Sequence, residues 1–394
     1  MFLQTIRKVV HNYKYDKRWN ETLRSRKKGH LAEIDEACKQ ANILLSTQPG
    51  EEVWLRKWAK LTPHVSVEFY RFYSCFIGND PNILPDDIFH AIIDPIINDK
   101  VSLPVYLNKN LYETLISEEA FPICVIRNIN GDYLDRDYKD IQMSEETFKG
   151  MVLENEKLIS QGRFIVKPTQ ETGRGKGVHL FCYADGKWVG DNNRVMTLDY
   201  LNQEYRRDFI IQECIEPSDF VRQFNPVSYS TCRIYTYRSV VDGSMHFLGG
   251  YLRVGDVGSF KDNIGSGGFA IPILQDGSLA PFASNGTRNR FDCVNGIDLK
   301  NGNFKVPNFN KVLDLAFFGA KKNPLNRVIS FDILLDKNNV PHIVEFNLRA
   351  QTITTMQTTY KTFFGEYTDE IIDYCVNKLK KGYYPVYTSY LKKR

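Results

Sequence analysis

Residues 328–347 read VISFDILLDKNNVPHIVEFN, two apolar runs joined by a polar turn. Side chains alternate along a strand, so an antiparallel hairpin here would place Asp332, Glu345 and Asn347 on one face. Two carboxylates and an amide oxygen suit Mg²⁺, which completes its shell with water and substrate phosphates. The stretch therefore predicts a metal-binding hairpin. The alternative is a solvated polar face, which the apolar run VISFDILL disfavours.

A glycine-rich segment lies far upstream, where residues 164–168 read FIVKP and residues 171–178 read ETGRGKGV. Glycines at alternate positions let backbone amides approach an anion closely. Lys167, on the strand before the loop, can place a positive charge against a phosphate. These features predict an anion-binding loop; the alternative is an ordinary flexible hairpin turn.

Short β-branched runs dominate the chain beyond residue 160, and helical patterns precede and follow them. Strands are expected at 164–168, 178–183, 208–215, 230–240, 245–255, 328–335 and 342–347. Helices are expected at 144–160, with Ser144 as the cap, and near 309–320 and 367–381. The pattern predicts an α+β chain built mainly on antiparallel sheet.

The first hundred residues carry no chemical motif. Their apolar residues recur at helical spacing, and the aromatic stretch 65–77 is expected to lie in the core. We therefore expect a mainly helical N-terminal region over residues 1–105. The basic stretch 17–30 predicts a solvated face; the alternative is docking to an anionic membrane surface or a partner.

The composition excludes several classes of protein. A net charge of +4 is too small to suggest nucleic-acid binding, and 42% hydrophobic residues argue against a disordered chain. The first apolar stretch is broken at Arg7 and Lys8, so we do not expect it to be a secretory signal. No apolar run is long enough to span a membrane. Eight scattered cysteines are typical of reduced thiols, so a cytoplasmic location is expected. The motifs of P-loop, dinucleotide, nucleophile-elbow and protein-kinase sites are absent.

The two motifs together resemble the ATP-grasp superfamily, over roughly residues 105–380. Thirteen positions separate Asp332 from Glu345, and two separate Glu345 from Asn347, as in the D…E-x-N metal motif of that superfamily. The resemblance implies that ATP is held by the lysine and the loop, and that two Mg²⁺ ions are held by the hairpin. The residues so implied are, for ATP, Lys167, Gly173, Gly175, Lys176 and Gly177, and, for the metal, Asp332, Glu345 and Asn347.

The resemblance also implies two further parts of the nucleotide site. The family's α-phosphate lysine corresponds to Lys109 at a short helix start, with Lys100 as the competing candidate. Residues 209–215 resemble the hinge strand between two subdomains, which would cover residues 106–215 and 216–394. The hinge positions implied to hold adenine and ribose are Gln212, Glu213, Ile215 and Asp219, with Glu216 as the alternative to Asp219.

A narrower resemblance, to the sugar-transfer-associated ATP-grasp proteins of bacterial surface-polysaccharide gene sets, rests on residues 230–236, 251–255 and 261–268. These match the series T-x-R-I, L-R-x-G and D-N-x-x-x-G-G. Two arginines on adjacent strands can clamp a phosphate or carboxylate bidentately. The residues so implied at the reacting groups are Arg233, Arg253, Asn263 and Arg349.

The implied reaction transfers the γ-phosphoryl group of ATP to a carboxylate, and an amine then attacks the acyl phosphate to form an amide. The expected substrates are a small molecule or glycan with a carboxylate, such as a uronic acid of a surface polysaccharide, and an amine such as an amino acid. The glycine-rich loop at 172–177 is expected to act as a lid. The alternatives are a kinase acting on a hydroxyl and a nucleotide-binding regulatory protein without catalysis. A further alternative is that the N-terminal region binds a membrane surface or a partner in polysaccharide assembly.

Overall fold

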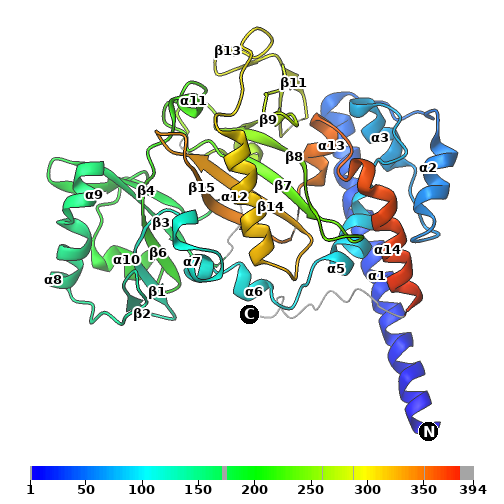
Figure 1. The fold of residues 1–394 in the computed structure, drawn as a ribbon, viewed down its shortest axis with the longest axis horizontal. Helices are drawn as coiled ribbons and strands as arrows, with labels where there is room; N and C mark the ends of the chain where they lie inside the picture. Colours follow the sequence, from blue (N-terminus) through cyan, green and yellow to red (C-terminus); the bar gives the residue numbers. More distant parts are fainter. Residues whose placement is uncertain (1, 171–174, 260, 287, 350, 382–394) are drawn as a thin grey trace.

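Two antiparallel sheets and a group of helices lie side by side across the molecule (Figure 1). The computed structural model describes residues 2–170, 175–259, 261–286, 288–349 and 351–381. Within these residues no helix is both long enough and apolar enough to cross a membrane. The combination of helices with antiparallel sheet confirms the predicted α+β class.

The first sheet has six strands in the order β2-β1-β6-β3-β4-β5. Its central strands pair through Ile165 with Gln212 and through Val166 with Ile211. One face packs against helices in a buried aliphatic and aromatic core that includes Phe164. The elements are β1 (Cys124–Ile129), β2 (Asp132–Leu134), β3 (Arg163–Pro168), β4 (His179–Ala184), β5 (Lys187–Gly190), β6 (Phe209–Glu213), α8 (Glu145–Phe148), η4 (Lys149–Leu153), α9 (Glu156–Gln161) and α10 (Leu198–Glu204).

The second sheet has seven strands in the order β11-β10-β9-β8-β7-β14-β15. Phe331 of β14 packs against α12, where an added Cβ on Gly319 would lie 2.8 Å from its ring, so only glycine allows this approach. Every residue of β14 is buried. The elements are β7 (Cys232–Arg238), β8 (Met245–Val254), β9 (Phe269–Ile273), β10 (Ala283–Asn285), β11 (Arg290–Phe291), β14 (Val328–Leu335), β15 (Pro341–Asn347) and α12 (Phe309–Lys322).

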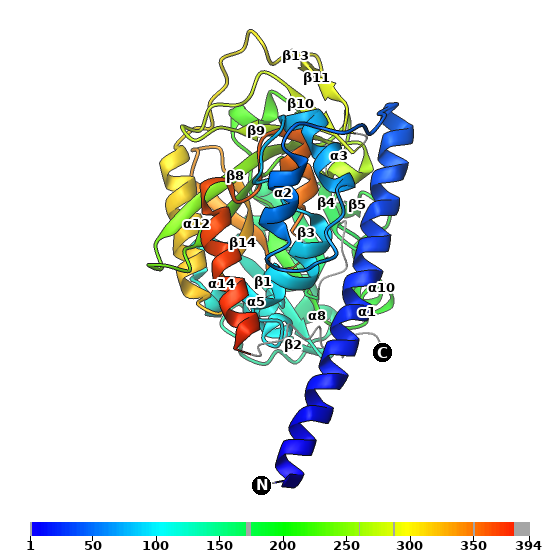
Figure 2. The ribbon, with the colours of Figure 1, turned by 90° about the vertical axis from the view of Figure 1, so that its right-hand side faces the viewer.

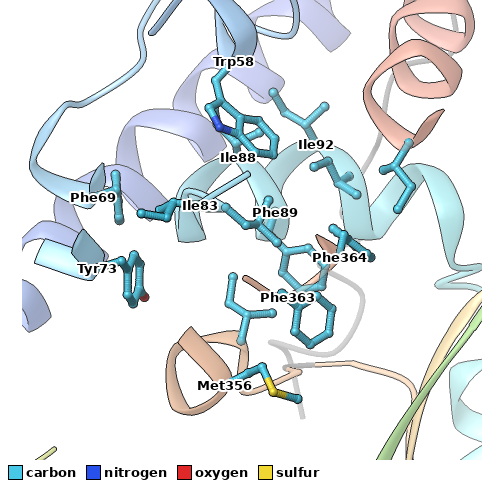
Figure 3. Close-up of a cluster of buried hydrophobic side chains, with 14 of the residues drawn as sticks. Trp58, Phe69, Tyr73, Ile83, Ile88, Phe89, Ile92, Met356, Phe363 and Phe364 are labelled. Carbon is cyan, nitrogen blue, oxygen red and sulfur yellow. The ribbon is translucent and has the colours of Figure 1, made fainter. Parts of the chain in front are cut away.

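The N-terminal helices share one core with the last two helices of the described chain. Phe89 contacts both Phe363 and Phe364, with ring centroids 5.7 and 6.1 Å apart, and Met356 lies nearby (Figure 3). The aromatic stretch of α3 is buried there, as predicted. The elements are α1 (Phe2–Ala41), α2 (Glu51–Trp58), α3 (Glu68–Ile77), α4 (Asp86–Ile88), η1 (Phe89–Ile93), α5 (Asp94–Ile97), α13 (Ile353–Thr359) and α14 (Thr368–Lys380).

Helix α1 is continuous through the basic stretch, and its N-terminal end extends beyond the body of the molecule (Figure 2). Arg24, Arg26 and Lys28 are exposed, whereas Ile34 and Ala37 are buried against the shared core. These three cations therefore lie on the outer face of α1.

The helix expected over 144–160 is interrupted. Ser144 caps its start by accepting a hydrogen bond from the Thr147 amide at 3.1 Å, as predicted. The chain then passes through a π-helical turn, η4, and Asn155 caps a new helix by accepting from the Leu158 amide. An asparagine side chain that competes for backbone amides explains the break.

The two sheets occupy residues 124–213 and 232–347, and the predicted subdomain boundaries at 105 and 215 stay a prediction. The remaining elements are α6 (Leu103–Tyr106), η2 (Lys109–Leu111), α7 (Tyr112–Leu115), η3 (Glu118–Ala120), α11 (Asp219–Arg222), η5 (Ile264–Ser266), β12 (Cys293–Val294), β13 (Ile297–Asp298) and η6 (Gly365–Tyr367).

Candidate active site

Polar side chains gather on one face of the second sheet. Asp332 on β14 is directly opposite Glu345 on β15 and Arg233 on β7. Asn347 lies two positions beyond Glu345, opposite Ser330. Directly opposed residues of an antiparallel pair point to the same side, so the register brings these groups together. The other face of the same strands packs on α12.

Asp332 is held by two arginines. Its side chain is 4% exposed, and Arg233 binds it in two-pronged fashion, with Nε to Oδ1 at 2.7 Å and Nη2 to Oδ2 at 2.6 Å. Arg253 on β8 donates from Nη1 to Oδ2 at 2.8 Å. Burial alone would raise the pKa of Asp332, but the two guanidinium groups outweigh it and lower that pKa. The carboxylate is therefore ionised and electrically compensated.

Two lysines approach β15 from elements that lie outside the second sheet. Lys109, at the start of η2, places Nζ 3.2 Å from Oε1 of Glu345. Lys167, on β3 of the first sheet, donates to the Val344 carbonyl at 3.4 Å. Burial first, and then the nearby charge of Lys109, lower the pKa of Lys167 to about 8. Both ammonium groups thus lie beside the strand that carries two of the predicted metal ligands.

Lys100, the competing candidate for the phosphate lysine, lies in a different environment. Its Nζ forms an ion pair with the buried Asp94 at 2.7 Å and donates to the Leu348 carbonyl at 3.3 Å. It therefore ties α5 to the end of β15, whereas Lys109 contacts Glu345 directly.

The glycine-rich loop is described from Gly175 onward, and Gly173, with the rest of 171–174 in the expected lid, lies outside the described residues. Gly175 and Gly177 have positive φ angles of 66° and 74°, a conformation that favours glycine. The Gly175 carbonyl accepts a hydrogen bond from Lys261 of the second sheet's β8–β9 loop at 3.3 Å. Lys176 is exposed. The glycine-rich loop of the first sheet thus contacts the β8–β9 loop of the second sheet.

At the predicted hinge, two side chains make contacts within the first sheet and its helices. Glu213 accepts from the Ile123 amide at 2.9 Å and pairs with Lys157 at 3.0 Å. Burial opposes the effect, but these donors lower the pKa of Glu213. Gln212 donates to the Pro122 carbonyl at 3.2 Å. Neither contact tests the adenine prediction for Glu213 and Ile215, which concerns their backbone groups.

The remaining predicted residues are spread around this face. Asp219 begins α11 and is fully exposed, while Glu216 is half-exposed. Arg349 is half-buried, two residues beyond Asn347. The Asn263 side chain accepts from the Gly265 amide at 3.0 Å, so it stabilises its own turn.

Sequence reasoning missed Asp262, the residue before Asn263. Its Oδ1 lies 2.8 Å from Nη2 of Arg253, so the aspartate of the D-N pair, and not the asparagine, contacts the arginine cluster. The sequence did contain a signal for this contact. Asp262 is part of the D-N-x-x-x-G-G motif, but our prediction names only the asparagine of that motif as a site residue.

The donor atoms fit a hard cation. Asp332, Glu345 and Asn347 supply carboxylate and amide oxygens on one face, and the Oγ of Ser330, opposite Asn347, is buried without a hydrogen-bond partner. Among the described residues, no three His, Cys, Asp or Glu side chains are grouped to hold a metal. An ion here would therefore take further oxygens from water or phosphate, as Mg²⁺ usually does.

The chain is similar to several solved structures and to one protein family. Three solved structures resemble the chain: an ATP-grasp ligase, PsnB, with its minimal precursor (10% identity, TM-score 0.35, 72% of this chain and 63% of that one), an L-amino acid ligase from Bacillus licheniformis (12%, 0.33, 68% and 47%) and the D-alanine-D-alanine ligase from Coxiella burnetii (9%, 0.35, 70% and 60%). The chain thus spans less than two thirds of each of these structures. No curated protein matches it. A sequence profile described as "Sugar-transfer associated ATP-grasp" matches residues 91–369, well over half of the chain. The chain therefore belongs to the sugar-transfer associated ATP-grasp family.

Proposed function

We propose that the protein is an ATP-dependent carboxylate–amine ligase that works through an acyl phosphate. One observation carries the proposal: Lys109 contacts Glu345 and Lys167 contacts the Val344 carbonyl, both on β15, next to the face where Arg233 and Arg253 surround Asp332. Phosphoryl transfer depends on positioning and charge neutralisation, and such an arrangement of cations and carboxylates supplies both.

In this proposal, Lys109 and Lys167 bind the phosphates of ATP. The lowered pKa of Lys167 reports a poorly hydrated site, where a phosphate would restore its full charge. Gly173, Gly175, Lys176 and Gly177 complete the phosphate loop. Backbone groups of the hinge, at Gln212, Glu213 and Ile215, hold adenine, and Asp219 holds ribose.

Asp332, Glu345 and Asn347 would hold two Mg²⁺ ions, which when bound neutralise charge on the transferred phosphoryl group. Arg233 and Arg253 offer planar forks of donors that match a carboxylate or an acyl phosphate. Arg349 and Asn263 are proposed to orient the acyl donor. Closure of residues 172–177 over the site would exclude the water that hydrolyses acyl phosphates.

The family match supports a sugar-linked substrate. We propose a uronic acid of a surface polysaccharide as the acyl donor and an amino acid or amine as the acceptor. The proposed reaction consumes ATP, and all eight cysteines are free thiols. Both features favour a cytoplasmic enzyme. The proposed division is a helical region at 1–105, a small ATP-grasp subdomain at 106–215 and a large one at 216–394.

The exposed cations of α1 support a further contact, with an anionic membrane surface near the site of polysaccharide assembly. Arg24, Arg26 and Lys28 are all exposed on this helix. Binding to anionic liposomes at low salt, lost at high salt, is expected. Absence of binding to such liposomes would refute this contact.

Hydroxylamine trapping tests the reaction. The protein is incubated with Mg·ATP and a panel of uronic acids, uronate glycans and amino acids, while ADP and phosphate are quantified in parallel. Hydroxamate formed from one carboxylate class is the expected result. ADP without hydroxamate or free phosphate would instead indicate a kinase, and nucleotide binding without turnover on any substrate would indicate a regulatory protein.

A further inference from the structure

Asp262 is a largely buried carboxylate with hydrogen-bond and ion-pair partners on both of its oxygens. It lies in the loop between β8 and β9, and its side chain is 12% exposed. Oδ2 accepts from the Thr231 amide at 3.0 Å and from Thr231 Oγ1 at 2.5 Å. Oδ1 faces Arg253 Nη2 at 2.8 Å. Thr231 directly precedes β7, so the carboxylate is fixed to the rigid sheet and not merely to its own loop.

Arg253 is consequently shared between two carboxylates. Nη2 faces Asp262, and Nη1 faces Oδ2 of Asp332 at 2.8 Å. Asp332 already has the two-pronged contact of Arg233. Two guanidinium groups are thus balanced by two carboxylates in a poorly hydrated cluster. Without Asp262, the positive charge of Arg253 would be compensated by Asp332 alone, because a buried charge without a partner is costly.

The way in which the charge of Arg253 is shared matters because Asp332 is one of the three proposed metal ligands. An arginine that turns both amino groups to Asp332 competes with a cation for the same oxygens. The geometry therefore makes the metal affinity of Asp332 depend on Asp262, a residue whose described contacts are with Thr231 and Arg253.

We propose that Asp262 is a positioning residue that divides Arg253 between two carboxylates and so keeps Asp332 available to Mg²⁺. The inference rests on the proposed function and deepens its metal site. Asp262 holds the guanidinium group of Arg253 in one orientation on the sheet face. Its neighbour Lys261 donates to the Gly175 carbonyl, so the loop that carries Asp262 also contacts the glycine-rich loop.

The test measures Mn²⁺ binding to the ADP complex by electron paramagnetic resonance, with ADP affinity measured separately by calorimetry. Asp262→Asn is expected to weaken Mn²⁺ binding by about tenfold or more, the usual effect of removing a support of a metal ligand. ADP affinity in the absence of metal should stay within about threefold, because the nucleotide lysines are untouched. Asp262→Glu is expected to recover part of the loss.

A matched control separates positioning from a general loss of negative charge. Asp256 lies in the same loop, is exposed, and its Oδ1 accepts only from the next amide, that of Val257, among the contacts seen. Asp256→Asn removes one charge there and should leave Mn²⁺ affinity unchanged. An equal loss in both variants would overturn the proposal.

Thr231→Val gives an independent variant if Asp262→Asn fails to fold. It removes the Oγ1 donor but keeps the carboxylate, and it should weaken Mn²⁺ binding in the same direction by a smaller factor. Unchanged Mn²⁺ affinity in Thr231→Val and in a folded Asp262→Asn would refute the positioning role. A wild-type protein that binds neither ADP nor Mn²⁺·ADP would instead refute the proposed function itself.

Discussion

At the scale of single residues, the carboxylates of Asp332 and Glu345 have positively charged partners before any substrate arrives. Asp332 has two arginines, and Glu345 has Lys109. Lys167 has only a backbone carbonyl among its described hydrogen bonds, together with a lowered pKa near 8. Compensation of this kind keeps a buried polar cluster folded, and it means that ligands must exchange contacts that the protein already makes.

Replacing Glu345 by glutamine should slow turnover far more than it weakens ATP binding. The amide keeps the shape of the side chain but removes a charge that the metal requires in the transition state. Turnover is expected to fall more than about tenfold, equivalent to about 1.4 kcal/mol. Steady-state kinetics and calorimetry with ATP check this, with the exposed Glu366→Gln as the control. Turnover within about tenfold of wild type would remove Glu345 from the metal site.

Lys167→Ala should weaken ATP binding substantially, and Lys167→Arg should change its pH dependence. The pKa of about 8 means that the free protein loses this proton as the pH rises through 8, so wild-type ATP affinity should fall above that pH. Arginine stays protonated there, so the variant should lose this decline. Calorimetry in buffers of different ionisation enthalpy measures the proton uptake. Unchanged affinity in Lys167→Ala would contradict the phosphate role.

At the scale of elements, polar residues at helix ends have surroundings that the local sequence does not predict. Asn155 follows one helical segment and caps the next, although the Ser144 cap predicts one helix over 144–160. Asp86 and Asp87 begin α4 as buried acids, although an N-terminal position in a short helix usually lies in solvent. Asp86 is held by Tyr73 at 2.5 Å and by Thr354 of α13 at 2.8 Å, so a distant element decides its environment.

Asp87→Asn should stabilise the protein at neutral pH. Burial raises the pKa of Asp87 from 3.8 to about 6, so between those values the folded state binds more protons than the unfolded state. The free energy of unfolding therefore falls as the pH rises through this window. The variant should gain about 2 kcal/mol at pH 7 and progressively less toward pH 4. Denaturant titrations at several pH values test it, with the exposed Glu52→Gln as control. A gain that does not depend on pH would contradict burial of the ionised group.

At the scale of the whole molecule, the N-terminal helices share a hydrophobic core with the second sheet. Their core includes Tyr235, Tyr251 and Val328 of the second sheet as well as the C-terminal helices α13 and α14. The hydroxyl groups of Tyr235 and Tyr251 meet Thr352 at 3.0 and 3.3 Å, on the same sheet face as Arg233. The helices therefore cover one half of the face whose other half carries the candidate site.

Phe363→Ala should destabilise the N-terminal and C-terminal parts together. Phe363 is fully buried against Phe89, and loss of such a side chain costs about 3–5 kcal/mol. Hydrogen exchange should show faster opening in α3 and η1 as well as in α13. Leu44→Ala, at a side chain that is 90% exposed, should change stability by less than about 0.5 kcal/mol. Faster exchange confined to residues 353–381 would show that the two parts fold separately.

The sequence by itself determined seven strands, the mainly antiparallel character of the sheets, the helices near both ends of the described chain and the family, because these depend on local periodicity and on short motifs. It did not predict β1, β2, β5 or the strands from β9 to β13. Alternation predicted that Asp332, Glu345 and Asn347 share one face of a hairpin, and the folded pair, with an irregularity after Asp332, places Asp332 directly opposite Glu345. Tertiary structure alone decided that Arg253 is divided between Asp332 and Asp262, that Lys109 rather than Lys100 contacts Glu345, and that the first hundred residues share a core with the last helices. These contacts join residues far apart in the chain, and no spacing in the sequence encodes how the folded elements bring them together.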